Sequence, residues 1–382
     1  MTGSAERIET VIIGGGQAGL AVGYHLAKRG RPFVILDGGA RIGDSWRTRW
    51  ASLRLFTPAK YDGLPGWRFP APRWSFPTKD EMGDYLEAYA ERFDLPVHTG
   101  IRVDGIARSG ERYVVTAGPR RFEAEHVVVA TGANRTPRVP GFAGELDPRI
   151  VQLHSSAYRD PSQLRDGTVL VVGAGNSGAE ITWELALTHR IWLSGRGVSE
   201  VPVRHGSTKA RIALPVIRFL GHRVLTVRTP VGRKAGPRIA HGATPLIRIQ
   251  SQDLAGAGVE RVARVAGIRD GLPVLDDDRV LTPDNVIWCT GFRQDFSWID
   301  LPVLGEDGQP VHDRGVARSE PGITFVGLPF QYAVTSEVLP GVGRDARRIA
   351  RHLARLARAA QRSPGLAQTG PEATTAVETG IS

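Results

Sequence analysis

Two glycine-rich turns carry the clearest chemical signal in this 382-residue sequence. The first, Gly14-Gly15-Gly16-Gln17-Ala18-Gly19, follows the apolar run 11–13 and precedes a segment whose apolar residues recur at helical spacing. A strand, a glycine turn and a helix in this order are typical of dinucleotide binding, because the helix N-terminus can hold a pyrophosphate. The second, Gly173-Ala174-Gly175-Asn176-Ser177-Gly178, has the same context after the apolar run 168–172. We therefore predict two nucleotide sites.

The residues that end the next strands suggest which nucleotide each turn binds. Asp37 follows the apolar run 33–36, where a carboxylate can accept hydrogen bonds from ribose hydroxyls. The matching position after the second turn reads Ser194-Gly195-Arg196 and has no acid. Since an acid would repel a 2′-phosphate and arginine can pair with it, the second site is interpreted as one for NADP(H). The alternative, that Arg196 is an ordinary solvated loop arginine, stays open.

The segments that must position these turns alternate between strands and helices. A helix is predicted from Thr78, with Glu81 completing a capping box, to about residue 93. Short runs at 97–99, 101–108, 113–116 and 121–123 predict a small antiparallel sheet, followed by a buried strand at 126–132. Further strands are predicted at 190–193, 259–265, 286–292 and 323–327, and a final amphipathic helix at 344–358.

The repeat of the strand, turn and helix pattern predicts an α/β protein with two Rossmann-like, three-layer dinucleotide-binding domains. Prolines and glycines make 137–148 a linker, and the strand at 286–292 mirrors Ala130-Thr131-Gly132, as expected if the chain crosses back. The predicted domains are 1–150 with 284–362, and an inserted 151–283. Residues 363–382 are rich in Gly, Thr, Ala and Glu, and we expect them to be disordered.

Two stretches have no simple periodic pattern. Prolines and tryptophans crowd the segment from Trp46 to Trp74, which is expected to form a ligand wall or a cap. Basic residues alternate with apolar patches over 200–250. That pattern is typical either of helices packed on the domain with arginines outward, which we favour, or of a membrane-surface element.

Composition excludes several classes of protein. Apolar residues at 41% and charged residues at 23% are ordinary for a globular protein. A net charge of +10 comes without any nucleic-acid motif, so no nucleic-acid partner is expected. The single cysteine, Cys289, cannot form a redox-active pair, and the histidines lack metal-ligand spacing. Without a signal core or a long apolar run, a cytoplasmic protein that is not an integral membrane protein is expected.

Taken together, the ordered motifs resemble the flavin-containing monooxygenase-like family, including CzcO-like and YUCCA-type flavoproteins. They comprise both glycine turns, Gly43-Asp44-Ser45-Trp46-Arg47, Leu53-Arg54-Leu55, Ala130-Thr131-Gly132, His154-Ser155-Ser156-Ala157-Tyr158 and Thr290-Gly291-Phe292. The resemblance implies FAD at the first turn and NADPH at the inserted one. One departure stands out: Pro148 and Ile150 occupy positions where the family's monooxygenase signature has Phe and Gly.

Position by position, the resemblance implies two sets of site residues. The cofactor-binding set is Gly14, Gly16, Gln17, Ala18, Gly19, Asp37, Gly43, Trp46, Arg47, Val103, Ala130, Thr131, Gly132, Gly173, Gly175, Asn176, Ser177, Gly178, Ser194, Arg196, Thr290 and Gly291. The catalytic candidates are Trp46, Thr57, Tyr61 and His154. His154 is expected to orient a linker or the nicotinamide end rather than to act as a base. No metal site is expected.

The leading functional hypothesis is an NADPH-dependent FAD monooxygenase that oxygenates a small organic substrate through a flavin C4a-(hydro)peroxide. Its expected partners are that substrate and oxygen, and a homo-oligomer is left open. A second hypothesis is an NADPH-dependent flavoprotein reductase that inserts no oxygen. A third is a non-catalytic FAD- and NADP-binding redox sensor. The chemistry belongs largely to the flavin, so a shortage of acid–base residues does not separate them.

Overall fold

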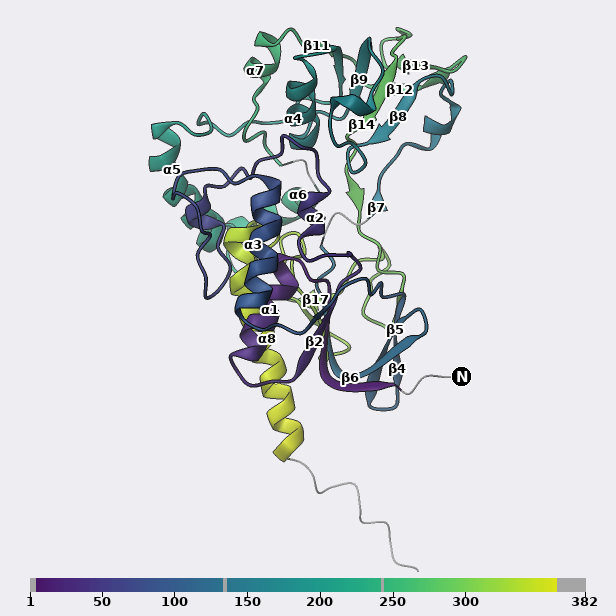
Figure 1. The fold of residues 1–382 in the computed structure, drawn as a ribbon. Coiled ribbons are helices and arrows are strands. Elements are labelled where there is room, and N and C mark those ends of the chain that lie inside the picture. The colour runs from purple at the N-terminus through teal and green to yellow at the C-terminus, as the bar shows by residue number, and fades with distance from the viewer. Residues whose placement is uncertain (1–4, 133–135, 242–243, 363–382) are drawn as a thin grey trace, which may run out of the picture.

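The structure of the protein, a computed structural model, describes residues 5–132, 136–241 and 244–362, without the side chains of 237–241. Two β-sheets lie one above the other in Figure 1, and a thin connection of two short strands joins them. The predicted disordered tail, 363–382, lies outside the described residues. Of the described helices, none is both long and apolar enough to cross a membrane.

The first sheet combines a parallel part with an antiparallel part. Parallel pairing runs through β3 (Val97–His98), β2 (Phe33–Leu36), β1 (Glu6–Ile13), β6 (Arg120–Val129) and β19 (Ile323–Phe325). The first half of β6 pairs antiparallel with β5 (Arg112–Ala117), and β5 pairs with β4 (Gly105–Ser109). Short strands complete it: β16 (Ile299–Asp300), β17 (His312–Asp313) and β18 (Val316–Ala317).

Side chains of β1 alternate between two cores, which places the sheet in the middle of three layers. Ile12 packs with the helices α1 (Gln17–Ala27), α3 (Lys79–Arg92) and α8 (Leu339–Arg362). Val11 and Ile13 point to the other face and pack with β4 and β5. Because successive side chains of a strand point to opposite faces, a stretch that is buried on both faces is apolar, as the end of β1 is at Val11, Ile12 and Ile13.

The second sheet is wholly parallel, in the order β11 (Glu260–Val262), β10 (Arg190–Ser194), β9 (Thr168–Val172), β14 (Asn285–Trp288) and β8 (Val151–His154). A hairpin, β12 (Val265–Arg269) with β13 (Leu272–Leu275), lies beside it. The helices of this part are α4 (Asn176–Leu185) and α7 (Ser251–Gly256). Two cores pack against its faces, one with α4 and α7 and one with the hairpin.

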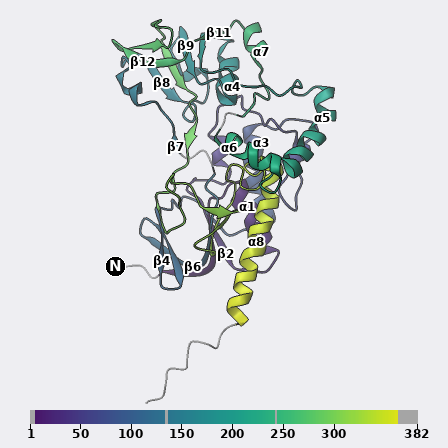
Figure 2. The same ribbon diagram turned by 180° about the vertical axis from the view of Figure 1, so that it is seen from behind.

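The connection between the sheets is a pair of two-residue strands, β7 (Thr136–Pro137) and β15 (Phe292–Arg293), which are antiparallel. Figures 1 and 2 show β7 between the two units. Both predicted domain boundaries, at 150 and at 284, differ from the places where the chain passes between the two units. β14 lies in the second sheet between β9 and β8, so the chain crosses back only after residue 288. Residues 141–150 likewise pack in a core of the second unit.

Helix limits follow local sequence closely where capping residues mark them. Thr78 caps α3, its hydroxyl accepts from Glu81 N, and the Glu81 carboxylate accepts from Thr78 N, which confirms the predicted capping box. α8 begins at Leu339, five residues before the predicted start. Pro340 stands in its first turn, where a missing N–H breaks no helical hydrogen bond.

The basic segment departs from expectation. It folds into α5 (Thr208–Phe219), a turn η4 (Leu220–Val224) and α6 (Pro230–His241). The favoured prediction of helices packed through an apolar side is wrong for α5, where only Ala210 is buried. Ile212, Val216 and Phe219 are instead 73%, 58% and 60% exposed.

Candidate cofactor sites

The first glycine turn joins β1 to α1 with three glycines in different roles. Gly14 has φ +109°, and a Cβ there would lie 2.5 Å from the Ala130 carbonyl oxygen. A Cβ on Gly19 would lie 1.9 Å from the Gly14 oxygen, so helix and strand can approach only if this residue is glycine. Gly16, the N-cap of α1, faces open space, with nothing within 4 Å of an added Cβ. An anion fits at that point.

The second turn, between β9 and α4, repeats this geometry. Gly173 has φ +114°, and a Cβ there would lie 2.3 Å from the Cys289 oxygen. A Cβ on Gly178 would lie 1.8 Å from the Gly173 oxygen. Gly175 is the N-cap of α4 and again has nothing within 4 Å. The backbone of both turns therefore leaves the same open position at a helix N-terminus.

The strand ends next to the turns differ in charge. Asp37 follows β2, and its carboxylate accepts hydrogen bonds from Gly15 N at 2.5 Å and Gly39 N at 2.7 Å. Ser194 ends β10 with a fully buried hydroxyl that donates to Ala263 O and accepts from Val265 N. That hydroxyl is thus engaged within the protein.

Two arginines stand beyond Ser194. Arg196 is exposed, two residues past the end of β10. Arg261, on β11, donates through Nη2 to Gly195 O at 2.8 Å. Partial burial lowers the pKa of Arg261 below its usual value. Sequence reasoning missed this residue because it comes close to Gly195 only through the pairing of β10 with β11, and the two residues are 66 positions apart along the chain.

A cavity of about 180 Å³ lies beside the second turn. Its walls include Ala174 of the turn, Gly197, Val198, Leu246, Leu254 and Arg261. The Asn176 side chain holds one wall, since its Oδ1 accepts from Ile247 N and its Nδ2 donates to Pro245 O. Asn176 therefore shapes this cavity through the 244–247 loop, and Arg261 brings a positive charge to it.

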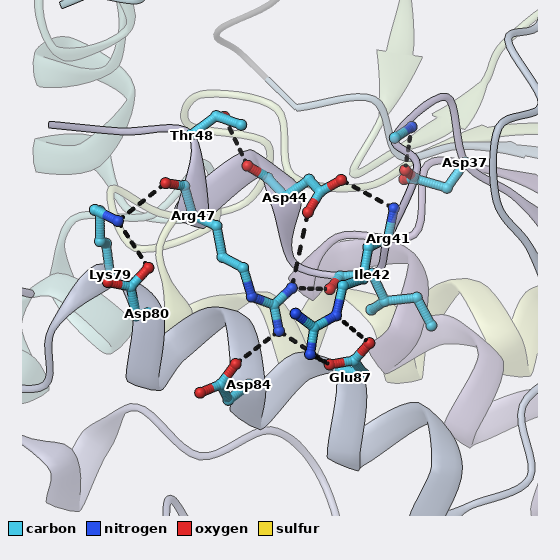
Figure 3. A network of polar contacts seen from close by, with 11 residues as sticks. Asp37, Arg41, Ile42, Asp44, Arg47, Thr48, Lys79, Asp80, Asp84 and Glu87 are labelled. Atoms are coloured by element: carbon cyan, nitrogen blue, oxygen red, sulfur yellow. Dashed lines mark hydrogen bonds and ion pairs between the residues drawn. The ribbon is translucent and has the colours of Figure 1, made fainter. Parts of the chain in front are cut away.

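A network of polar contacts fixes the loop after β2 (Figure 3). Arg47, at the end of α2 (Asp44–Arg47), donates to Ile42 O at 2.5 Å and pairs with Asp84 at 2.8 Å and Glu87 at 3.0 Å on α3. Its side chain is 15% exposed. The Arg47 guanidinium is occupied by these partners and thus holds the loop of Gly43 and Trp46 against α3.

Gly43 makes the close approach in this network possible. It has φ +89°, and a Cβ there would lie 2.4 Å from the Gly83 oxygen of α3. Lys79 donates through Nζ to Arg47 O at 3.0 Å and to Asp80 at 2.7 Å (Figure 3). Trp46 packs partly buried against the core beneath α1 and α3.

The aromatic loop contains a buried carboxyl that sequence reasoning missed. Thr57 donates its hydroxyl hydrogen to Asp62 Oδ1, and Asp62 has no exposed surface. Asp62 Oδ2 has no hydrogen-bond partner within the described part of the chain. Burial raises the pKa of Asp62 to about 7, opposed by the Thr57 hydrogen bond. This carboxyl can therefore hold or release a proton near neutral pH.

Tyr61 lies among cations and rings. The Lys60 ammonium stands 5.1 Å from the Tyr61 ring centre, and Arg218 of α5 stands 5.1 Å from the same ring. Trp74 meets Tyr61 edge to face at 6.5 Å. The loop thus contacts the basic segment through Tyr61 and Trp74.

His154 is held at both ring nitrogens. Its Nδ1 accepts from Ser156 N at 3.1 Å and contacts Ser156 Oγ at 2.9 Å, while Nε2 lies 3.0 Å from Gly291 O. A carbonyl only accepts, so Nε2 carries the hydrogen. Burial, and to a lesser extent Arg49, lowers the pKa of His154. A neutral His154 therefore ties β8 to the chain after β14.

The remaining predicted residues surround the turns and the connection. Ala130 N donates to Ile13 O, and Thr131 and Gly132 follow it. Gln17 donates to Glu337 O just before α8, and Ala18 and Val103 are buried. Thr290 donates to Arg138 O, and Gly291 O accepts from Arg138 N beside β7. Ser177 is in the first turn of α4. These residues thus lie at the two turns and at the connection between the sheets, except Val103, which is buried in the core that packs β4 and β5 on the first sheet.

Two further observations concern redox and metal chemistry. Burial raises the pKa of the Cys289 thiol to about 12, and the chain has no second cysteine. The protein therefore cannot form an internal redox disulfide. Among the residues that the structure describes, no group of three or more His, Cys, Asp or Glu side chains could hold a metal ion.

Comparison with known proteins assigns the class. Residues 11–202 match the pyridine nucleotide-disulphide oxidoreductase family, and the chain belongs to this family. It is 38% identical over 342 residues to an uncharacterized CzcO-like oxidoreductase of Geobacillus kaustophilus, covering 89% of this chain and 96% of that protein. The predicted resemblance to CzcO-like and YUCCA-type proteins is confirmed.

Two other relatives narrow the class. Probable indole-3-pyruvate monooxygenase YUCCA3 of Arabidopsis thaliana is 30% identical over 389 residues, covering 90% of this chain and 86% of its own. A flavin-containing monooxygenase from Stenotrophomonas maltophilia has a solved structure with TM-score 0.73 and 28% identity, covering 92% and 99% of the two chains. The protein is a flavoprotein oxidoreductase of the flavin-containing monooxygenase-like group, and the predicted two-domain α/β fold is confirmed.

Proposed function

We propose that this protein is an NADPH-dependent, FAD-containing monooxygenase that transfers one oxygen atom to a small organic substrate. One atom of O₂ enters the substrate, and the other leaves as water after taking up the two electrons and the proton of the NADPH hydride and one further proton from solvent. FAD and NADPH are its cofactors, and the flavin, through a C4a-(hydro)peroxide, supplies the oxygen activation. The pair of open glycine turns carries this proposal.

The residues present fit these two groups. Gly16 and Gly175 have no side chain, so each leaves open space at the N-terminus of its helix. The unpaired backbone N–H groups at each helix N-terminus favour a pyrophosphate in that space. Asp37 offers carboxylate oxygens for a ribose at the first turn. Arg196 and Arg261 offer positive charge at the second, which favours NADPH over NADH. We assign FAD to the first turn and NADPH to the second on this difference.

The other candidate residues hold the loops around the two cofactor sites in place. Arg47 holds the loop that bears Gly43 and Trp46 against α3. His154, neutral and bonded on both sides, keeps the segment after β14 next to β8. Asp62, protonated below about pH 7, can hold a proton behind the Thr57 hydroxyl without placing a charge in an apolar loop. We propose Thr57, Tyr61 and Trp46 as the side chains nearest to the chemistry.

The test is anaerobic reduction of the purified protein by NADPH, followed by mixing with oxygen and observation by stopped-flow absorbance. We expect the yellow flavin to bleach and then to pass through a long-lived intermediate absorbing at shorter wavelength than the oxidised flavin. Reoxidation without that intermediate would support the reductase instead. Flavin that NADPH does not bleach would support the redox sensor. Protein that stays colourless after incubation with FAD would end the proposal.

We also propose a cytoplasmic location for this enzyme. A substrate screen follows from the mechanism: soft nitrogen or sulfur nucleophiles in one arm, and ketones or 2-oxo acids in the other. The rate of NADPH consumption and the yield of oxygenated product, measured together, separate coupled oxygen transfer from simple loss of reducing equivalents as hydrogen peroxide.

A further inference from the structure

The helix α5 has its apolar side outward. Ile212, Val216 and Phe219 recur at three- to four-residue spacing, so they share one side of the helix. They are more than half exposed, and no α5 residue belongs to any hydrophobic core of the described chain. A surface helix of a globular protein ordinarily packs its apolar side on the core. This side therefore lacks an intramolecular partner among the described residues.

The basic side of α5 is the one that meets the protein. Arg211 and Arg218, seven residues apart and so on one side, stand over the rings of Trp74 and Tyr61 at 5.8 Å and 5.1 Å. Such cation–π contacts hold a helix without burying apolar surface. Upstream, the His205 ring packs at a tilt against Phe76, with 4.0 Å between the ring centres. Figures 1 and 2 both show α5 at the edge of the molecule, away from the two sheets.

The charge around α5 is concentrated in one segment. Residues 201–250 contain ten Lys and Arg and no Asp or Glu, whereas the whole chain has 49 basic and 39 acidic residues. Without this segment, 39 of each kind remain, so the entire formal net charge of +10 belongs to it. Leu220 and Val231 extend the exposed apolar surface, 44% and 57% exposed, with Arg223 and Arg228 exposed beside them.

A second cationic feature adjoins the turn after α5. Arg344 of α8 donates a hydrogen bond through Nη1 to His222 O at 3.3 Å. It also lines a hollow of about 260 Å³ whose walls are Arg314, five arginines of α8 and His352. Nε of Arg314 and Nε of Arg348 are buried without a partner in the described chain. The arginines that line this hollow place a further concentration of positive charge beside η4.

We propose that α5 and η4 form a peripheral docking surface for a bilayer that contains anionic lipid. Exposed apolar side chains on one side of a helix, with cations around them, are what an interfacial helix needs. The cations would be attracted to a negatively charged leaflet, and the apolar side chains would enter its headgroup region. A second copy of this chain is disfavoured as occupant, because pairing the two surfaces would bring the four cations of α5 and η4 in one copy against the same four in the other, namely Lys209, Arg211, Arg218 and Arg223. The inference does not depend on the proposed oxygenation.

Sedimentation of the full chain with vesicles tests the proposal. We expect binding to vesicles of phosphatidylcholine mixed with phosphatidylglycerol, weak binding to phosphatidylcholine alone, and loss of binding at high salt. The double variant Ile212→Glu/Phe219→Glu should bind at least about tenfold more weakly, since it removes the apolar contact and adds repulsion. Far-UV circular dichroism and thermal unfolding show whether each variant is folded.

Leu187→Glu is the matched control. Leu187 is 82% exposed and lies two residues after α4, in the second unit. This variant should bind vesicles as the unaltered chain does. Equal losses in the control and in the double variant would overturn the proposal, as would no binding to either vesicle. Self-association in analytical ultracentrifugation that Ile212→Glu/Phe219→Glu abolishes would also overturn it in favour of a dimer.

Discussion

The two nucleotide turns of this protein have nearly the same backbone and different surroundings. Their N-cap residues have φ and ψ of −80° and −171° at Gly16 and of −76° and −173° at Gly175. At the next strand end, however, the first turn has Asp37 and the second has Ser194, Gly195 and two arginines. The comparison separates two requirements: the turn accommodates a pyrophosphate, and the residues after the next strand distinguish one nucleotide from another.

The largest expected effects come from the glycines that join helix to strand. Gly19→Ala and Gly178→Ala would place a Cβ within 2 Å of a backbone oxygen. Since neither a helix nor a strand can move freely, each should cost more than about 4 kcal/mol of stability or prevent folding. Thermal unfolding measures this. Gly256→Ala, in open space on α7, is the control and should change stability by less than about 1 kcal/mol.

The aromatic loop near the first turn contains a buried carboxyl, Asp62, that forms no ion pair among the described residues. The folded pKa of Asp62, about 7, lies above its ordinary value of 3.8. Its contribution to stability is therefore fully present below about pH 4 and is lost as the pH rises through 7. At most about 4 kcal/mol is involved, at about 1.4 kcal/mol per pKa unit.

Asp62→Asn should flatten this part of the stability profile between pH 4 and 7, measured by denaturant unfolding at several pH values. Asp166→Asn, a change at an exposed carboxyl, should leave the profile as it is in the unaltered chain. A profile that Asp62→Asn does not alter would contradict a raised pKa at this position.

Substitution of Gly16 or Gly175, the glycines that face open space, should weaken the binding of one cofactor and leave the other unaffected. Gly16→Ala and Gly175→Ala meet no protein atom within 4 Å, so both variants should remain folded. An added methyl group would instead obstruct the pyrophosphate, and we expect about a hundredfold weaker FAD binding in the first and NADPH binding in the second. Flavin absorbance per protein and the NADPH Michaelis constant give the two readouts. Loss of flavin from Gly175→Ala would reverse our assignment.

The smallest expected effect concerns the choice of nicotinamide cofactor. Arg196→Ala and Arg261→Ala should each raise the Michaelis constant for NADPH about tenfold and hardly change that for NADH, because only NADPH has the 2′-phosphate. Arg264→Ala, a half-exposed arginine beyond β11, is the control. Equal changes for both nucleotides would contradict a phosphate role for either arginine.

Local signals in the sequence were sufficient for much of the fold. The two glycine patterns and the capping box at Thr78 each specify a short-range geometry, and the structure has them where predicted. The run at 97–99 was predicted for the antiparallel sheet, but β3 pairs parallel with β2. The predicted domain boundary at 284 differs from the structure, in which residues 285–288 still belong to the second sheet. A buried apolar strand such as β14 carries no mark of which of two similar sheets it joins. The two-residue strands β7 and β15 are too short for any period to be visible.

The candidate site was less accessible to prediction where contacts are distant in sequence. Arg261 reaches Gly195 only through pairing of β10 with β11, and the burial of Asp62 depends on packing around the loop. For α5 the sequence predicts an apolar side but cannot say what covers it. That side faces outward here because Arg211 and Arg218 stack on Trp74 and Tyr61.

The pairing of β6 with both β1 and β19 has a consequence for how the chain is made. The first sheet needs residues 323–325 beside β6, whereas every strand of the second sheet lies within 151–288. During synthesis the inserted unit can thus fold on the ribosome before the unit that precedes it is complete. Nascent chains stalled with residue 300 just outside the exit tunnel should accordingly protect the inserted unit from protease and leave the amino-terminal segment open to digestion.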